Sequence, residues 1–180
     1  AINSWGVLYL QEIRGYSLIE AGGIISLNTF TGILGCVAFG FISDKYFSAQ
    51  RPPVTLMFGV VEIVSLLVIF FGPSSTIVLT IAFLVYGFTL SGLLAVLGGL
   101  FALDIAPKNI SGAAMGFIGL FSYIGAGIQE KISSLLIKTS SLKGSSDLVY
   151  NFDSAILFWV IASVISFLLS LTLWNKKIED

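Results

Sequence analysis

The sequence contains no histidine and only one cysteine, Cys36, among its 180 residues. Without histidine, the common zinc sites and imidazole acid–base catalysis are excluded, and a single cysteine cannot form a disulfide within the chain. Phosphate-binding loops, serine nucleophile motifs and metal-ligand clusters are also lacking. These absences argue against an enzyme, and they predict no bound metal and no cofactor.

Charge is scarce as well. Charged residues make up 11% of the chain, whereas soluble domains carry roughly a quarter. Hydrophobic residues make up 56%, and the mean hydropathy is +0.99. A chain of this length cannot bury so much apolar surface away from water, so we expect a lipid bilayer as its solvent. The net charge of −1 and the lack of a basic stripe argue against nucleic acid as a partner.

Apolar runs recur along the chain at lengths suited to a membrane. A membrane helix needs about 20 mostly apolar residues, and polar segments near residues 43–53, 72–75, 104–109 and 139–147 separate the runs. The sequence therefore predicts an all-α, polytopic membrane protein. The expected spans are residues 1–12 (too short to cross alone), 17–42, 54–71, 75–103, 110–138 and 154–174.

Lysine and arginine favour the cytoplasmic side of membrane proteins when they occur in short loops. One side of this chain would hold Lys45, Arg51, Lys108, Lys176 and Lys177, and the other Arg14, Lys138 and Lys143. This modest bias predicts a cytoplasmic C-terminus.

Small residues distinguish some of these spans from the others, because they let helices approach closely in lipid. The spans 17–42, 75–103 and 110–138 are rich in them, so we expect these three to be packed inside. Bulky residues dominate 54–71 and 154–174, which should face lipid more. Two ridges of small residues stand out: Gly87, Ser91, Ala95, Gly98 and Ala102 on one helix, and Gly112, Gly116 and Gly119 on another.

A few polar residues interrupt the apolar runs, and charges in such positions usually mark function. Glu130 and Lys131 are adjacent, so their side chains diverge by about 100° on a helix and cannot both face one pore squarely. One of them could contact substrate while the other meets a neighbouring helix. The alternative is that both lie near the outer membrane surface, where Lys131 would extend to water. Glu62 is central in its span, where it would be protonated or bonded to a neighbouring helix, and a proton-coupling role is an alternative.

Other polar positions also have two interpretations. Asp44, Lys45 and Arg51 are either plain topology signals or a gating contact between helix ends. Asn3 is a candidate for a cavity lining, while Trp5 and Tyr9 would line a cavity or belong to an interfacial belt. Asn28, Thr29 and Thr31 are either polar groups of a pore or, as is commoner, side chains bonded to backbone carbonyls. Asp104 and Lys108 are expected to form a clamp at a helix end instead of binding a ligand.

Three segments resemble a known family. The loop G-F-I-S-D-K (residues 40–45), with Arg51 after it, is similar to the cytoplasmic loop between the eighth and ninth helices of major facilitator superfamily transporters. The run A-P-K to I-G-A (residues 106–126) resembles the tenth-to-eleventh helix region of the organophosphate:phosphate antiporter branch. Asn3-Ser4-Trp5-Gly6 resembles the seventh helix of the hexose-phosphate transporter and sensor group.

The resemblance implies a twelve-helix fold of two six-helix halves, with substrate held between them at mid-membrane. This chain would be the C-terminal half, helices 7–12 with helix 7 truncated, and the N-terminal half would be its partner. The implied function is exchange of phosphorylated sugars or related organophosphates for inorganic phosphate across an inner membrane. One arginine from each half would bind the phosphate, and the arginine of this half would lie upstream of Ala1.

The resemblance also implies site residues. Tyr123 corresponds to a cavity-facing tyrosine, and Gln129, Glu130 and Lys131 lie where relatives place charged selectivity residues. With Asn3 and Trp5, these are the candidate substrate-binding residues. Two alternatives remain: a membrane sensor of external hexose phosphate with the same fold, and a proton-coupled carrier of another small solute.

Overall fold

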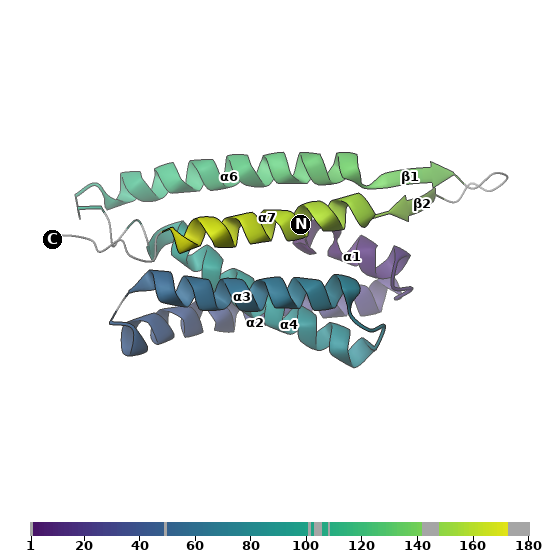
Figure 1. Ribbon diagram of the computed structural model, residues 1–180, viewed down its shortest axis with the longest axis horizontal. Coiled ribbons are helices and arrows are strands. Elements are labelled where there is room, and N and C mark those ends of the chain that lie inside the picture. The colour runs from purple at the N-terminus through teal and green to yellow at the C-terminus, as the bar shows by residue number, and fades with distance from the viewer. Residues whose placement is uncertain are drawn as a thin grey trace.

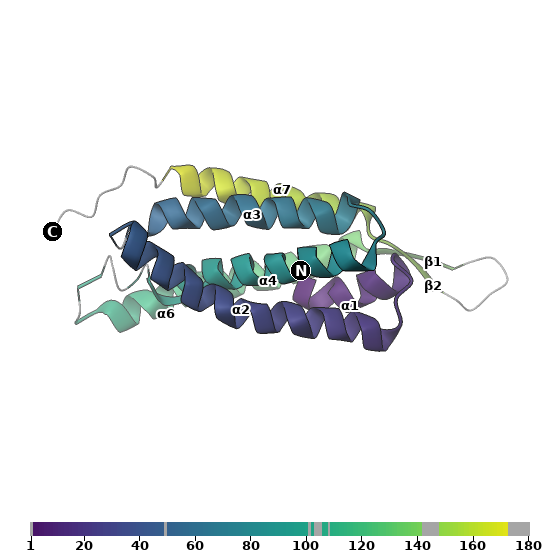
Figure 2. The same ribbon diagram turned by 90° about the horizontal axis from the view of Figure 1, so that it is seen from below.

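The helices of this chain lie side by side along one long axis, in the views of Figure 1 and Figure 2. The computed structural model describes residues 2–48, 50–100, 102, 106–107, 109–141 and 148–172. Its elements are α1 (Ile2–Glu12), α2 (Leu18–Tyr46), α3 (Arg51–Phe71), α4 (Thr76–Ala95), the π-helix η1 (Val96–Leu100), α6 (Ser111–Leu136), β1 (Lys138–Ser141), β2 (Leu148–Asn151) and α7 (Asp153–Leu171).

Within the described residues, five helical segments are long and apolar enough to cross a membrane: Leu18–Tyr46, Arg51–Phe71, Thr76–Gly99, Ser111–Leu136 and Asp153–Leu171. They coincide with the five full spans expected from the sequence. The all-α membrane fold is therefore confirmed.

The turn between α2 and α3 is shorter than the predicted loop at 43–53. The helix α2 continues to Tyr46, and α3 already begins at Arg51. Proline fits the first turn of a helix because the amide hydrogen that it lacks has no intrahelical partner there. Pro52 and Pro53 therefore lie inside the start of α3 instead of preceding it.

The most extensive contact between two helices is that of α2 with α4, where glycines bring the backbones together. A side chain on Gly35 would overlap the carbonyl oxygen of Phe88, and one on Gly87 would overlap that of Asn28. This confirms that small residues pack α2 closely against α4.

Two predictions about packing are wrong. The ridge Gly112, Gly116 and Gly119 of α6 meets open space, and Ser133 is the one residue of α6 that is buried. Small residues permit close approach, but they do not specify a partner, and the described part of the chain does not cover this ridge. Conversely, half of the residues in the most apolar window of α3 are buried, because bulky side chains such as Leu66 and Ile69 fill the core.

The segment between α6 and α7 was expected to be a polar loop, but it contains an antiparallel pair of strands. The backbone of β1 pairs with β2 from Lys138 opposite Asn151 to Ser141 opposite Leu148. The hairpin extends beyond the helices in Figure 1. Threonine, valine and tyrosine favour strands, but four residues a strand is too short for a clear alternating pattern.

Candidate functional site

One end of α6 is attached to α1 through Glu130. The hydroxyl of Ser4 donates to Oε1 of Glu130, and the indole Nε1 of Trp5 donates to Oε2, both over 2.8 Å. Each carboxylate oxygen therefore receives a donor from a helix more than a hundred residues away in sequence. We call this group of three side chains the α1–α6 clamp. It directs the Glu130 carboxylate toward α1, so Glu130 acts here as a link between helices.

The same end of α6 is attached to α7 through Ser133, which is fully buried. The indole Nε1 of Trp159 donates to the Ser133 hydroxyl over 2.8 Å, and the Gln129 amide donates to it over 3.0 Å. The Ser133 hydroxyl in turn donates to the Gln129 carbonyl. Gln129, a candidate substrate ligand, thus takes part in the contact between α6 and α7.

The rest of α6 presents an open stripe. Gly112, Gly116, Gly119, Tyr123 and Glu130 follow one another at intervals of three, four or seven residues, so they share one face of the helix. The side chain of Tyr123 is 81% exposed. The stripe is therefore uncovered from Gly112 to Tyr123 and is closed by α1 only at Glu130. These five residues are called the α6 stripe.

Lys131 lies about 100° around the helix from Glu130. Lys131 is exposed. Among the described residues, no group forms an ion pair or a hydrogen bond with its ammonium. Of the candidates on α6, Tyr123 and Lys131 are thus the two whose polar ends remain open to a ligand.

Asn3 is not open in the same way. The Asn28 amide donates to Oδ1 of Asn3 over 3.2 Å and joins α2 to α1. Asn28 itself is buried, and its Oδ1 is the one buried side-chain acceptor without a partner in the described part of the chain. Thr29 and Thr31 donate to backbone carbonyls of their own helix, as expected. The same expectation is wrong for Asn28, whose amide donates to a side chain.

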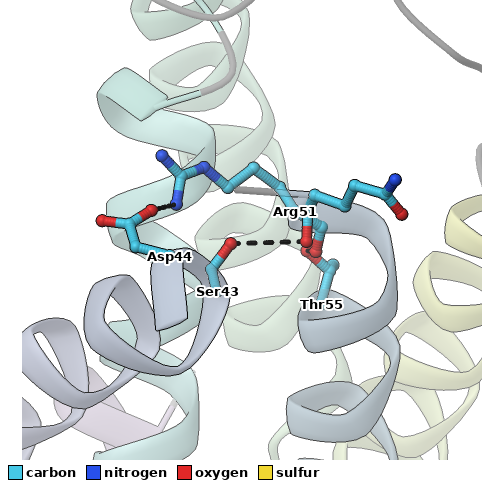
Figure 3. Close-up of polar contacts among 5 residues, drawn as sticks. Ser43, Asp44, Arg51 and Thr55 are labelled. Atoms are coloured by element: carbon cyan, nitrogen blue, oxygen red, sulfur yellow. Dashed lines mark hydrogen bonds and ion pairs between the residues drawn. The ribbon is translucent and has the colours of Figure 1, made fainter. Parts of the chain in front are cut away.

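The α2–α3 turn holds an ion pair between Asp44 and Arg51, with 2.6 Å between carboxylate and guanidinium (Figure 3). The Arg51 side chain is only 10% exposed, against 63% for Asp44. Ser43 and Thr55 donate to backbone carbonyls beside it, and the ammonium of Lys45 lies 5.0 Å from the ring centre of Phe41. Asp44 and Arg51 thus come together at one helix junction, whereas the Lys45 ammonium lies against aromatic rings. The gating role of these residues stays a prediction.

Arg14 has a structural role that the sequence analysis missed. Its guanidinium donates to the carbonyls of Ile69 and Phe70, over 2.7 and 3.2 Å, and to the hydroxyl of Tyr9. These carbonyls belong to the last turn of α3, where a cation is favourable. The sequence offered one clue, because Arg14 lies beside a short turn on the same side of the membrane as the end of α3. No local sequence pattern specifies the contact between them.

Glu62 is buried in the middle of α3, and the hydroxyl of Ser163 on α7 donates to its Oε1 over 3.2 Å. The predicted hydrogen bond to a neighbouring helix is therefore confirmed. A charged side chain at the centre of a membrane helix costs roughly 2.5–3.5 kcal/mol, whereas one interhelical hydrogen bond contributes about 0.6 kcal/mol. The structural contact alone does not offset that cost. The predicted pair of Asp104 and Lys108 lies outside the described residues.

Comparison with known proteins identifies the family. The family model of the Major Facilitator Superfamily matches residues 1–129. The chain is 36% identical over 129 residues to the membrane sensor protein UhpC of Salmonella typhimurium, covering 71% of this chain and 29% of that protein. It is 34% identical over 122 residues to the glycerol-3-phosphate transporter of Bacillus subtilis, covering 67% of this chain and 27% of the transporter.

A probable hexose phosphate transport protein of Chlamydia trachomatis is 35% identical over 129 residues, covering 70% of this chain and 28% of that protein. The chain therefore spans less than a third of the length of each of these relatives. Because the family model covers well over half of the chain and these relatives agree with it, the chain is a multi-pass membrane protein that belongs to the major facilitator superfamily, in its organophosphate:phosphate antiporter branch.

Proposed function

We propose that this chain is the C-terminal six-helix half of a secondary transporter that exchanges phosphorylated sugars or related organophosphates for inorganic phosphate. The observation that carries the proposal is the uncovered α6 stripe. Its glycines and Tyr123 form a face that is too small and too polar for a lipid-facing helix. Such a face fits the wall of a cavity that a second six-helix half would complete. Relatives that bear the names of glycerol-3-phosphate and hexose phosphate transporters support the substrate class.

The open polar groups suit a phosphorylated sugar. The ammonium of Lys131 and the hydroxyl of Tyr123 are hydrogen-bond donors, and an anionic substrate needs donors and positive charge. Arginines from both halves would supply the main phosphate contacts, since their planar guanidinium can bind a phosphate with two parallel hydrogen bonds. In this arrangement Asn3, Trp5, Gln129 and Glu130 join the helices that form the wall of the cavity, and Tyr123 and Lys131 contact the substrate.

The same proposal includes the partners of this half, its membrane and its orientation. The N-terminal half of the same protein and the surrounding lipid are its partners, in an inner membrane with the C-terminus on the cytoplasmic side. The protein would transport its substrate unchanged and would not act as an enzyme. Alternating access would move the two halves around the site, and the Asp44–Arg51 pair would lie at a junction that shifts between the two states.

Exchange in proteoliposomes tests the proposal. The whole protein that carries this chain is reconstituted into vesicles loaded with phosphate, and uptake of labelled glucose-6-phosphate is measured. We expect saturable uptake that requires internal phosphate, and none in vesicles without protein. Glycerol-3-phosphate and unphosphorylated glucose serve as competitors: the first should compete and the second should not. Uptake that ignores internal phosphate would contradict the exchange mechanism.

A membrane sensor of external hexose phosphate is the second candidate, and one observation favours it: the 36% identity to the membrane sensor of Salmonella typhimurium. A sensor of the same fold would bind glucose-6-phosphate without net exchange. The same vesicles separate the two functions, because saturable binding without phosphate-dependent uptake would indicate the sensor.

A further inference from the structure

A cavity of about 330 Å³ lies between α3, α7 and the end of α4 with η1. All of its described lining residues come from these elements. None comes from α1 or α6, which carry the clamp and the stripe. The cavity is therefore separate from the candidate substrate face, and the proposed exchange gives it no role.

The cavity has one polar wall and one apolar wall. Thr55 and Glu62 line it from one face of α3, and Ser163 and Ser166 line it from one face of α7. The opposite wall consists of four leucines of α4 and η1: Leu90, Leu93, Leu94 and Leu97. A small ligand in this space would meet hydrogen-bonding groups on one side and hydrocarbon on the other.

Glu62 supplies the ionisable group of the polar wall. The residue is 7% exposed, and Ser163 occupies one of its two carboxylate oxygens. Among the residues that the structure describes, no further hydrogen bond or ion pair reaches the carboxylate, and no lysine or arginine lines the cavity. Oε2 is thus left for a ligand, and a buried carboxylate favours a cationic partner with several donors.

The π-helix η1 is a second unusual feature of this cavity. Val96 and Leu97 of η1 both line it. A π-turn in an α-helix often marks a functional site, because it costs stability and re-aims the side chains around it. Here it lies on the apolar wall, opposite the serines of α7.

We propose that this cavity is a second binding site, which takes a small amphiphile with a primary ammonium group. The ammonium, with three donors, binds Oε2 of Glu62 and the hydroxyl oxygen of Ser166. The hydrocarbon part lies against the leucines and the ring of Phe167, which also lines the cavity. The volume is at the low end of the range of roughly 300–1,000 Å³ for small-molecule sites, which suits a single short chain.

Equilibrium binding of radiolabelled n-octylamine to the whole protein tests the proposal. The protein is held in phosphatidylcholine nanodiscs, and unlabelled octylamine or octanol is added as competitor. We expect saturable binding that octylamine displaces and octanol does not, because octanol has the same chain but no charge. Competition by octanol equal to that by octylamine would overturn the proposal.

Two variants of the site and one control sharpen the test. Glu62→Gln should weaken octylamine binding by about tenfold or more, since it removes a charge-assisted hydrogen bond. Ser166→Leu, which fills the cavity but leaves the carboxyl, should weaken binding similarly. Glu12→Gln, at an exposed carboxyl on the last residue of α1, should bind as the wild type does. If Glu62→Gln does not fold, Ser166→Leu decides, and wild-type affinity in that variant would refute the site.

The membrane itself can supply a primary ammonium through phosphatidylethanolamine. Binding of octylamine is therefore repeated in nanodiscs that contain this lipid. Weaker octylamine binding there would identify the lipid headgroup as the natural source. Unchanged binding would identify a free amine. Neither measurement depends on transport, so failure of this site and failure of the exchange proposal are distinguishable.

Discussion

Replacing Trp5 by phenylalanine removes the indole N–H that binds Glu130 and keeps an aromatic ring in its place. The donor lies 2.8 Å from Oε2, while Ser4 lies equally close to Oε1. Hydrogen bonds to charged groups contribute about 1.5–3 kcal/mol in soluble proteins, but interhelical bonds in membranes average about 0.6 and reach about 1.7 kcal/mol. Trp5 and Glu130 are both half-buried. We therefore expect Trp5→Phe to lower the free energy of unfolding by about 1 kcal/mol.

A double-mutant cycle isolates this contact. Trp5→Phe, Glu130→Gln and the double variant of the whole protein are unfolded with sodium dodecyl sulfate in mixed micelles, followed by circular dichroism. Because Trp5→Phe removes the donor and Glu130→Gln removes the charge of the acceptor in the same hydrogen bond, the double variant should lose about 0.5–1 kcal/mol less than the sum of the single variants. Tyr16→Phe is the control: its hydroxyl donates to Thr76, so its effect should add to that of Glu130→Gln.

The proposed exchange activity gives a second readout of the clamp. If Glu130 acts through α1, Trp5→Phe and Glu130→Gln should lower exchange by similar factors, and the double variant should be no worse than either one. A Glu130 that contacts substrate directly would instead change substrate preference by itself, and Trp5→Phe would leave that preference intact. Additive losses of stability, within about 0.3 kcal/mol, together with a change of preference in Glu130→Gln alone, would refute the clamp.

Three further predictions concern other parts of the chain. Arg14→Met should destabilise the protein by about 1–2 kcal/mol, since it removes the cation that binds the last carbonyls of α3; an unchanged unfolding midpoint would contradict this role. Lys131→Ala should raise the KM for glucose-6-phosphate about tenfold, equivalent to about 1.4 kcal/mol, with little change in stability; unchanged KM and selectivity would exclude a substrate contact. Gly35→Ala should prevent close packing of α2 on α4 and abolish folded protein on size exclusion, whereas the control Gly40→Ala, which meets open space, should fold normally.

The membrane spans could be predicted because hydropathy is a local property of the sequence. The junction at Asp44 and Arg51 could also be located, since both residues belong to one short turn. The contact of Glu130 with Ser4 and Trp5 could not be predicted. Glu130 and Lys131 are both charged residues within an apolar run, so the sequence does not distinguish them. Only the position of α1 in the fold determines which of the two bonds to another helix.

The packing of α6 is a second feature that the sequence alone could not specify. Gly112, Gly116 and Gly119 have the spacing of a packing ridge, and so do the glycines of α2 that lie against α4. A pattern of small residues indicates that another group lies close to the helix. The pattern is the same whether that group is a neighbouring helix, a substrate in a cavity or a second half of the protein. Arg14 illustrates the third case, in which a single charge finds its partners only when two turns, 60 residues apart in sequence, meet in the fold.

The π-helix η1 also separates two contact regions of the helix to which it belongs. Before it, Gly87 and Ser91 contact α2, where Cys36 donates to the Ser91 carbonyl. Within it, Gly99 lies beside Met115 of α6. A π-turn adds a residue to the helical turn and so rotates the later part of the helix by about 100°, which splits the ridge of small residues that the sequence showed as continuous. We expect deletion of Gly99 to restore an α-helical turn and to loosen α6, which cysteine cross-linking between η1 and α6 would detect. The two sides of η1 thus face different neighbours: α2 before the π-turn and α6 within it.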